Sequence, residues 1–247
     1  MLKLYEKPYK IQSSAVNAAG KLTVAEALRL FQDMAGEHSV VTGTDYYNLL
    51  TKNNAFWIIT RTRLHFNREP VMYEDTVAKT WPNPPGSIAA SRNYTLTGAD
   101  GEVAVSAMSE WMIIDAETRR VRRVNTTCYP TDEEHIPDTA IDEPYHRLFS
   151  AFEDSDLVFT HVIRCSDTDM TCHTNNTVYC RLMLDAFPTS FFKENTVTDF
   201  ELRYAMESRE GETVGIYRRS EGGKHCLAVK NSAGKILVTA EMDTIPA

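Results

Sequence analysis

The segment from Arg164 to Phe187 holds the densest group of side chains that could do chemistry. Two acids, a histidine and two adjacent asparagines lie within this short stretch (Asp167, Asp169, His173, Asn175 and Asn176). Apolar residues follow at helical spacing from Val178 to Ala186, and Pro188 stops the pattern. The polar group is therefore predicted at a helix N-terminus. Free backbone N–H groups and the helix dipole there favour an anion or a developing oxyanion.

The order of these residues also carries a family resemblance. The pattern D-x-D, three residues, H-x-N-N-x-x-Y, followed by an amphipathic helix, resembles the second hot-dog module of the acyl-acyl-carrier-protein (acyl-ACP) thioesterases of bacteria and plant plastids. That family usually has Asn two residues before the histidine, where this chain has Thr171. The resemblance extends over nearly the whole chain. It implies an α+β fold of two tandem hot-dog units, each a long helix wrapped by a curved antiparallel sheet, paired as an intrachain pseudo-dimer.

The first part of the chain shows this order of elements. An amphipathic helix is predicted over residues 22–35, with Gly36 as its stop, followed by a loop that contains Tyr46 and Tyr47. Strands are predicted over residues 56–66 and 75–81, and a long hairpin joins residues 89–97 to residues 103–115.

The order of elements then repeats after a region rich in proline and acids. A helix is predicted over residues 176–187, strands over 199–206 and 212–220, and a last hairpin that ends at Thr244. We therefore divide the chain into an N-terminal hot-dog unit on the acyl-pocket side (1–124), a linker (125–155) and a C-terminal hot-dog unit with the catalytic residues (156–247).

The two copies differ where the chemistry is expected. Aligning residues 28–30 with residues 180–182 gives an offset of 152, which places Lys21 opposite His173, with no acids at the matching positions. We therefore expect one active site per chain, built mainly by the second copy. The family resemblance implies that the first copy holds the acyl tail, and Phe31, Tyr46 and Trp57 are candidate substrate contacts. Acyl chain length and saturation preference do not follow from the sequence.

Hydrolysis of a thioester needs a nucleophile, a base that activates it and donors for the oxyanion. The resemblance implies that the catalytic group is formed by Asp169, Thr171, His173 and Glu207, and that the substrate also contacts Asn175, Asn176 and Ser208. For the asparagine pair alone, helix capping explains the pattern better. Simple strand alternation after Phe200 would send Ser208 inward and Glu207 outward, so Glu207 reaches the cleft only through a β-bulge. A solvent-facing charge at a strand end is the competing interpretation.

The densest basic cluster is Arg119, Arg120, Arg122 and Arg123, separated only by Val121. A cluster of this sign could attract an acidic carrier protein even though the chain has a net charge of −8. A solvated hairpin edge explains the run equally well.

Composition excludes several other classes of protein. Apolar content of 43% and charged content of 24% are globular values, and the acidic balance argues against general nucleic-acid binding. No apolar run approaches the length of a membrane span, and the N-terminus lacks the apolar core of a signal peptide. The five cysteines are irregularly spaced, which favours reduced thiols. We expect a soluble, cytoplasmic protein without metal or cofactor.

Three functions remain open at this point. The favoured one is hydrolysis of fatty acyl-ACP, with the phosphopantetheine-linked acyl chain of the carrier protein as substrate, which ends acyl chain elongation. A hot-dog dehydratase or hydratase of 3-hydroxyacyl thioesters would need Glu26 or Asp33 as its acid. A binder of acyl thioesters without catalysis is the third, because Thr171 replaces the usual asparagine. A homodimer of the fused unit is also possible.

Overall fold

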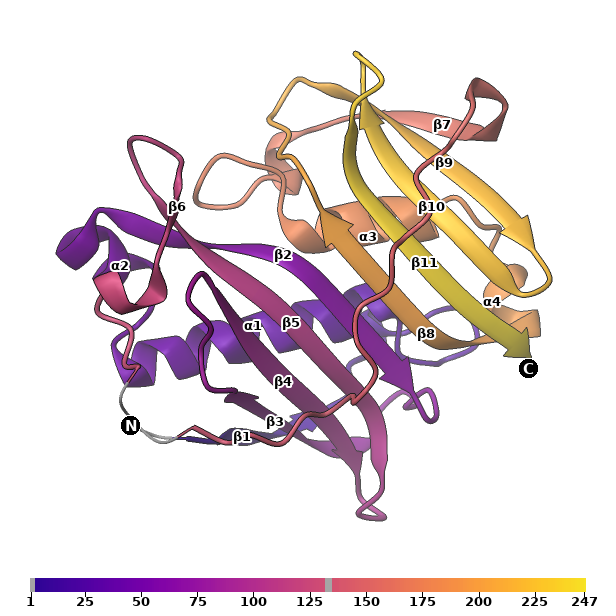
Figure 1. The fold of residues 1–247 in the computed structure, drawn as a ribbon. Coiled ribbons are helices and arrows are strands. Elements are labelled where there is room, and N and C mark those ends of the chain that lie inside the picture. The colour runs from indigo at the N-terminus through magenta and orange to yellow at the C-terminus, as the bar shows by residue number, and fades with distance from the viewer. Residues whose placement is uncertain (1–2, 132–134) are drawn as a thin grey trace.

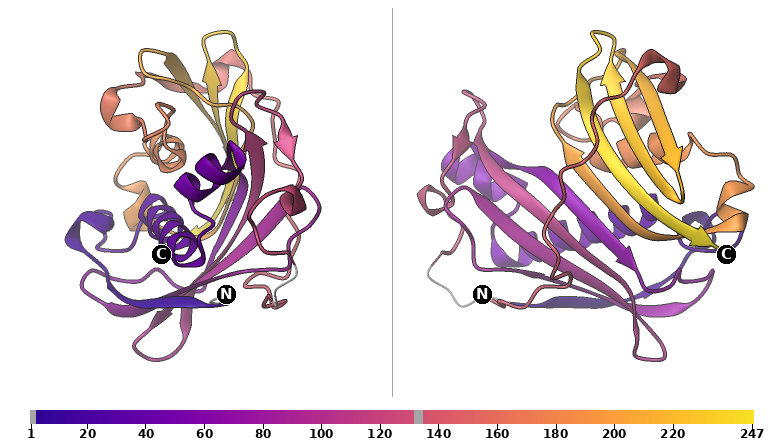
Figure 2. Two further views of the ribbon diagram at one scale, coloured as in Figure 1. Left: turned by 90° about the vertical axis from the view of Figure 1, so that its left-hand side faces the viewer. Right: turned by 45° about the vertical axis from the view of Figure 1, so that its right-hand side comes forward.

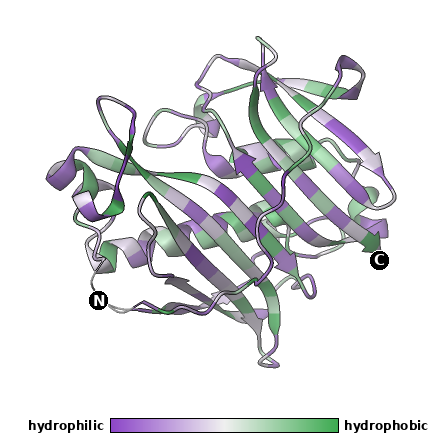
Figure 3. Cartoon of the chain, in the orientation of Figure 1, coloured by the Kyte–Doolittle hydropathy of each residue, from purple (hydrophilic) through white to green (hydrophobic). Residues whose placement is uncertain are grey.

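The structure, a computed structural model, describes residues 3–131 and 135–247. One antiparallel sheet of 11 strands curves around the helices, which lie together on its concave face (Figures 1 and 2). The strand order is β1-β3-β4-β5-β2-β8-β11-β10-β9-β7, and β6 pairs with β5 outside this path. Apolar residues alternate with polar ones along the strands (Figure 3), as expected when one face of a sheet is buried.

The elements fall into two halves of the same order. The first half contains β1 (Tyr5–Lys10), α1 (Val24–Thr42), α2 (Tyr46–Asn53), β2 (Ala55–Phe66), β3 (Asp75–Pro82), β4 (Ala89–Gly98), β5 (Val103–Asp115) and β6 (Val121–Arg122). The second contains β7 (Leu157–Val162), α3 (Asn176–Leu184), α4 (Phe191–Glu194), β8 (Asn195–Tyr204), β9 (Thr213–Glu221), β10 (Lys224–Asn231) and β11 (Ile236–Pro246).

The halves join where β2 pairs with β8. The register places Leu64 opposite Phe200 and Thr62 opposite Leu202. All four side chains are buried, and Leu64, Phe200 and Leu202 belong with Met34 and Leu182 to one hydrophobic core. This pairing covers one sheet edge of each half, which leaves β1 and β7 as the edge strands. The predicted α+β class and the continuous sheet within one chain are therefore confirmed.

Residue numbers show how closely the second half repeats the first. The start of β1 and of β7, and the start of α1 and of α3, each differ by 152. The isolated bridges Val16↔Leu22 and Thr168↔Thr174 differ by the same number. The structure therefore repeats with the same offset as the sequence alignment that places Lys21 opposite His173.

Helix α1 is longer than predicted. Thr23 caps its start by accepting a hydrogen bond from the backbone N–H of Glu26. The helix passes through Gly36 and ends at Gly43, where φ is 68° and the backbone N–H reaches the carbonyls of Ser39 and Val40. The predicted stop at Gly36 was wrong, because a helical glycine costs only about 1 kcal/mol and the buried His38 continues the helix face beyond it.

Other local predictions also need correction. The predicted loop at Tyr46 and Tyr47 is the start of α2, capped by Asp45. Helix α3 ends at Leu184 instead of residue 187, because the N–H groups of Ala186 and Phe187 donate to carbonyls three residues back and no longer follow the α-helical pattern. Strands β1 and β7 were not predicted. They are edge strands that pair with β3 and β9.

The chain between the halves crosses the outer face of the sheet (Figure 1). It contains no strand among its described residues, yet it is attached to the sheet at several points. Trp81 Nε1 donates to the Asp138 carbonyl at 2.9 Å, and Lys230 Nζ donates to the Phe152 carbonyl at 2.8 Å. The boundaries that divide this linker from the two units stay a prediction.

Candidate active site

A tight loop before α3 presents the polar group predicted from the sequence. The backbone N–H of Asp169 donates to the His173 carbonyl at 2.9 Å, and the N–H of Cys172 donates to the Asp169 carbonyl at 3.0 Å. Cys172 adopts a positive φ of 60°, which closes the loop. Asn175 then caps α3 by accepting from the N–H of Thr177 at 2.9 Å. Asp169 and His173 are thereby held on one short, internally bonded segment.

Three side chains form one hydrogen-bonded chain, and a fourth lies close to its end. Thr171 Oγ1 donates to Asp169 Oδ1 at 2.6 Å and lies 3.1 Å from His173 Nδ1. Because the threonine hydroxyl has a single proton, its oxygen accepts from His173 Nδ1–H. The other imidazole nitrogen, Nε2, lies 3.1 Å from Glu207 Oε2. The structure thus brings together all four residues predicted as catalytic.

Glu207 reaches this chain because the strand before it is irregular. Strand β8 ends at Tyr204, and the next two N–H groups, those of Ala205 and Met206, both donate to the Leu237 carbonyl at 2.8 and 3.1 Å. Two consecutive donors on one acceptor are the mark of a β-bulge. The bulge that the sequence required for an inward Glu207 is present. The Glu207 side chain is 41% exposed, whereas that of His173 is 12% exposed.

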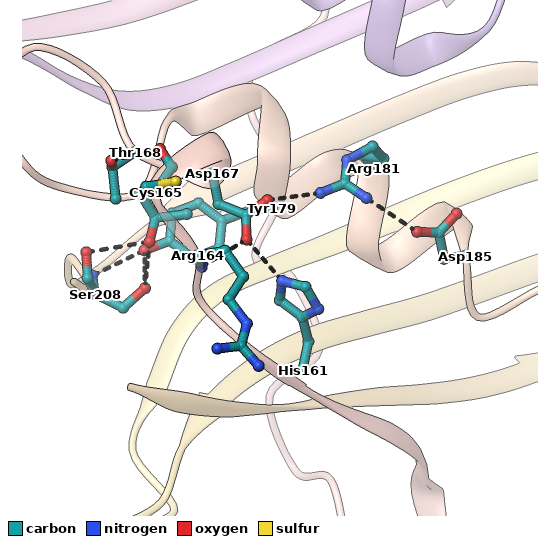
Figure 4. Close-up of polar contacts among 10 residues, drawn as sticks. His161, Arg164, Cys165, Asp167, Thr168, Tyr179, Arg181, Asp185 and Ser208 are labelled. Atoms are coloured by element: carbon teal, nitrogen blue, oxygen red, sulfur yellow. Dashed lines mark hydrogen bonds and ion pairs between the residues drawn. The ribbon is translucent and has the colours of Figure 1, made fainter. Parts of the chain in front are cut away.

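Ser208 lies beneath the cleft instead of on its wall. The residue is fully buried, and its hydroxyl lies 2.8 Å from Thr174 Oγ1 and 2.7 Å from the Tyr179 hydroxyl (Figure 4). Burial raises the pKa of Tyr179, although the hydrogen bonds from Ser208 and Thr174 act in the opposite direction. A neutral hydroxyl network therefore fixes the segment that carries Glu207 to the start of α3.

Asp167 anchors the same loop from its other side (Figure 4). Its Oδ2 lies 2.8 Å from His161 Nε2 and accepts from the Arg164 N–H at 2.9 Å. Its Oδ1 accepts from Arg181 Nη2 at 2.9 Å. Burial raises the pKa of Asp167, but its hydrogen bonds to His161 and Arg164 outweigh this, and the net pKa is lowered. All of these partners are structural, which fits a loop carboxylate.

Two cavities meet at the hydrogen-bonded chain. One, of about 540 Å³, is lined by His173, Glu207, Phe56 and Arg119. The other, of about 470 Å³, extends into the first half. Five residues line both cavities: Asp169, Thr171, Asn176, Trp57 and Trp111. A thioester at this junction could place its acyl chain in one cavity and its thiol arm in the other.

The predicted acyl contacts are only partly found on the cavity walls. Tyr46 and Trp57 line the cavity in the first half, and Trp57 is fixed by a 2.9 Å hydrogen bond to the Thr44 carbonyl. Phe31 instead lies in the core, with its ring stacked 5.1 Å from that of Tyr94. Trp111 was missed by the sequence analysis, because a tryptophan in a strand gives no signal that separates a cavity wall from ordinary packing.

The basic run does not form one surface. Arg119 Nη2 bonds to Glu207 Oε2 at 2.6 Å, and Arg122 donates to the backbone carbonyls of Asn53 and Thr126. Arg120 and Arg123 are exposed. Of the four arginines, these two are the ones left for a partner at the surface.

The first half keeps a counterpart of the His173–Glu207 pair. The Leu22 N–H donates to the Pro70 carbonyl at 2.8 Å, and the equivalent Thr174 N–H donates to the Ser208 carbonyl at 2.9 Å. Glu69 therefore matches Glu207. A smaller cavity of about 280 Å³ lies here, and its wall includes Phe187 and Phe192. Lysine has replaced the histidine here, and its Nζ lies 2.9 Å from Glu69 Oε2.

Within residues 3–131 and 135–247, no three histidine, cysteine or acidic side chains are grouped as a metal site. In the same residues no helix is long and apolar enough to cross a membrane.

Comparison with known proteins places the chain among thioesterases. The family model of the acyl-ACP thioesterase N-terminal domain matches residues 2–130, and that of the C-terminal domain matches residues 152–243. A chloroplastic acyl-[acyl-carrier-protein] hydrolase of Cuphea viscosissima is 23% identical over 93% of this chain. The chloroplastic oleoyl-acyl carrier protein thioesterase 2 of Arabidopsis thaliana is 25% identical over 88% of it. The chain spans 60% and 63% of the lengths of these two relatives.

Solved structures agree on the fold. The acyl-ACP thioesterase from Bacteroides thetaiotaomicron superposes with a TM-score of 0.88 at 21% identity and covers 98% of both chains. The 12:0-ACP thioesterase from Umbellularia californica gives 0.88 at 18% identity, with 99% of this chain and 98% of that one covered.

Proposed function

The chain belongs to the acyl-ACP thioesterase family, and from this premise we propose that it hydrolyses fatty acyl-ACP to free fatty acid and ACP. One observation carries the proposal: the two cavities meet at Asp169 and Thr171, within hydrogen-bond reach of the His173–Glu207 pair. The acyl chain would lie in the cavity of the first half, against Tyr46 and Trp57. The phosphopantetheine arm would enter through the other cavity.

Water serves as the nucleophile in this proposal. Glu207 takes one proton from the water, and the hydroxide attacks the thioester carbon. The tetrahedral intermediate then collapses with cleavage of the C–S bond, and the thiolate of the carrier protein takes a proton from His173. Glu207 passes the proton it took from water to His173, 3.1 Å away, so that both groups return to their starting states. A positioned acid or base contributes about 100-fold or more to such a step.

Asn176 is the best candidate donor for the oxyanion. Its side chain lines both cavities at the first turn of α3, and its amide has no hydrogen-bond partner among the described residues. The positive end of the helix dipole adds to its effect. Asn175 is occupied as the cap of the same helix.

The dehydratase alternative receives no support from the geometry. It would need Glu26 or Asp33 as its acid, and both bind Arg29, at 2.7 and 3.0 Å. Neither lies on the wall shared by the two cavities.

Docking of the carrier protein is proposed at Arg120 and Arg123, which are exposed near the cavity lined by Arg119. The cytoplasmic location and the homodimer remain proposals from the sequence.

The decisive experiment is an assay of the purified protein with acyl-ACP of several chain lengths. Release of free fatty acid that depends on His173 supports the proposal. Binding without release would identify an acyl-thioester binder, and formation of a conjugated double bond from 3-hydroxyacyl-ACP would identify a dehydratase.

A further inference from the structure

One residue of the first half reaches the candidate base of the second. Arg119 lies in the turn between β5 and β6, and its Nη2 donates to Glu207 Oε2 at 2.6 Å. The same oxygen lies 3.1 Å from His173 Nε2. Glu207 Oε1 has no partner among the described residues. The carboxylate is thus held through one of its oxygens, and the residue lines the cavity.

The turn that presents Arg119 is fixed by its own sequence. Asp115 Oδ1 accepts from the N–H groups of Glu117 and Thr118 and from the Thr118 hydroxyl. These hydrogen bonds lower the pKa of Asp115, the largest contribution being from the Thr118 N–H. The Asp115 N–H also donates to the Arg120 carbonyl at 2.9 Å. Arg119 itself adopts a positive φ of 58°.

The guanidinium group of Arg119 has a second anchor. Its Cζ lies 5.1 Å from the centre of the Phe56 ring, on β2 of the first half. Stacking on an aromatic face and a charge-assisted bond to a carboxylate together restrict an arginine more than either does alone. The Arg119 side chain is 43% exposed. Burial alone therefore does not fix its position, and the two contacts do.

We propose that Arg119 is a positioning residue of the active site: through its bond to Oε2 it orients the Glu207 carboxylate. The inference rests on the proposed function and assigns Arg119 to the reaction instead of to carrier docking. A charge-assisted hydrogen bond from a guanidinium group to a carboxylate fixes the direction of that carboxylate as well as its place. The first half therefore supplies a group to the site that the second half otherwise builds.

The groups around Glu207 support this role. Its cavity is also lined by His173, Asp169, Tyr179, Arg209 and Glu212. Arg119 is the arginine bonded directly to the carboxylate in the described structure. Without Arg119, Glu207 would lose the hydrogen bond that holds its Oε2 beside His173 Nε2.

The test compares Arg119→Met, Arg119→Lys and, as a charge-matched control, Arg147→Met at the exposed Arg147 of the linker. Each is assayed with acyl-ACP and with a small acyl thioester that lacks the carrier protein, from pH 5 to pH 9. We expect Arg119→Met to lower kcat about tenfold on both substrates and to leave KM almost unchanged, because Glu207 loses the bond that directs it. Arg119→Lys should recover part of the lost rate, because a lysine can still donate to the carboxylate but lacks the planar fork of the guanidinium group. Arg147→Met should match the natural protein.

Two results would overturn the inference. One is a rise in KM on acyl-ACP alone, with kcat unchanged, which would return Arg119 to the docking surface. The other is Arg119→Met behaving as Arg147→Met does on both substrates. Failure of the proposed function is distinct from both, since the natural protein would then release no fatty acid from any thioester.

Discussion

Lys21 Nζ and Glu69 Oε2 lie 2.9 Å apart, at the positions that His173 and Glu207 occupy in the other half of the chain. Lys21 also donates to Thr196 Oγ1 at 3.1 Å, and the Glu69 side chain is only 4% exposed. The first half has therefore kept the geometry of the second site, but an ion pair with a buried carboxylate stands in place of the histidine and glutamate. An ion pair of this kind stabilises the fold only as long as both partners remain.

Lys21→Met should destabilise the protein without impairing the reaction. The change leaves the carboxylate of Glu69 buried without its cation, and we expect a loss of about 3 kcal/mol in the free energy of unfolding. Turnover per folded molecule at 25 °C should stay within twofold of the natural value. Urea denaturation gives the first quantity and a steady-state assay gives the second.

The matched control for this change is Lys21→Met combined with Glu69→Gln. Removing both charges should recover most of the lost stability, because no unpaired charge stays buried. A tenfold fall in kcat in folded Lys21→Met protein would show instead that the first half takes part in the reaction.

Removal of His173 or Glu207 should abolish most hydrolysis. We expect His173→Ala and Glu207→Gln each to lower kcat/KM for acyl-ACP at least about 100-fold, the usual scale for a positioned acid or base. Glu207→Gln keeps the shape of the side chain and a hydrogen-bonding oxygen. The fall in kcat/KM of this variant therefore measures the contribution of the charge. Near-normal turnover in the Glu207 variant would contradict its assignment as the base, even though the bulge turns it into the cleft.

Much of the architecture could be predicted from the sequence because it depends on local patterns. Alternating apolar residues identified the hairpin of β4 and β5, and helical spacing identified α1 and α3. The repeat also placed Lys21 opposite His173 correctly. Strands β1 and β7 escaped prediction, because they are short edge strands whose pairing partners lie far away in the chain.

The site was harder to predict where its geometry depends on distant segments. The polar loop is local, so Asp169, Thr171 and His173 could be grouped from their spacing. The bulge after Tyr204 depends on the Leu237 carbonyl of β11, which no local pattern indicates. The contact between Arg119 and Glu207 spans 88 residues, and for that reason nothing in the sequence indicated that Arg119 is bonded to the active site while Arg120 and Arg123 are left for the surface.

Charge reversal at these two arginines should weaken carrier binding alone. We expect Arg120→Glu combined with Arg123→Glu to raise KM for acyl-ACP about tenfold and to leave a small acyl thioester almost unaffected. The difference should shrink as salt is added, because exposed charges are screened. An equal loss on both substrates would point to damage inside the cleft instead of at a docking surface.

Asp167→Asn tests the anchor of the active-site loop. Because the folded protein lowers the pKa of Asp167, its carboxylate stabilises the fold above the unfolded value of about 3.9. That contribution is lost as the pH falls through the folded pKa. Asp167→Asn should therefore cost about 3 kcal/mol at pH 7, and the gap to the natural protein should narrow below pH 4. Urea denaturation across this range measures both, and a gap that widened in acid would contradict the assignment.

Thr171 stands where the family usually has asparagine, so substitutions at this position test how far the family geometry applies. Its hydroxyl links Asp169 to His173 Nδ1, and it can offer only one proton. Thr171→Val keeps the shape and removes this link, so we expect kcat to fall about tenfold or more. Thr171→Asn supplies both a donor and an acceptor with greater reach, and it should preserve or raise turnover if the amide can point at the thioester oxygen.

Both variants should be measured beside Thr168→Val, whose hydroxyl bonds only to the Cys165 carbonyl and which should not alter kcat. Brisk hydrolysis by the natural protein with a nearly inactive Thr171→Asn variant would contradict the transfer of the family's asparagine to this position. In that case the loop geometry requires a hydroxyl, because Thr171 must bond Asp169 at 2.6 Å and His173 at 3.1 Å through a single oxygen. A longer amide would then push the imidazole away from Glu207 and break the chain on which the proposed proton transfers depend.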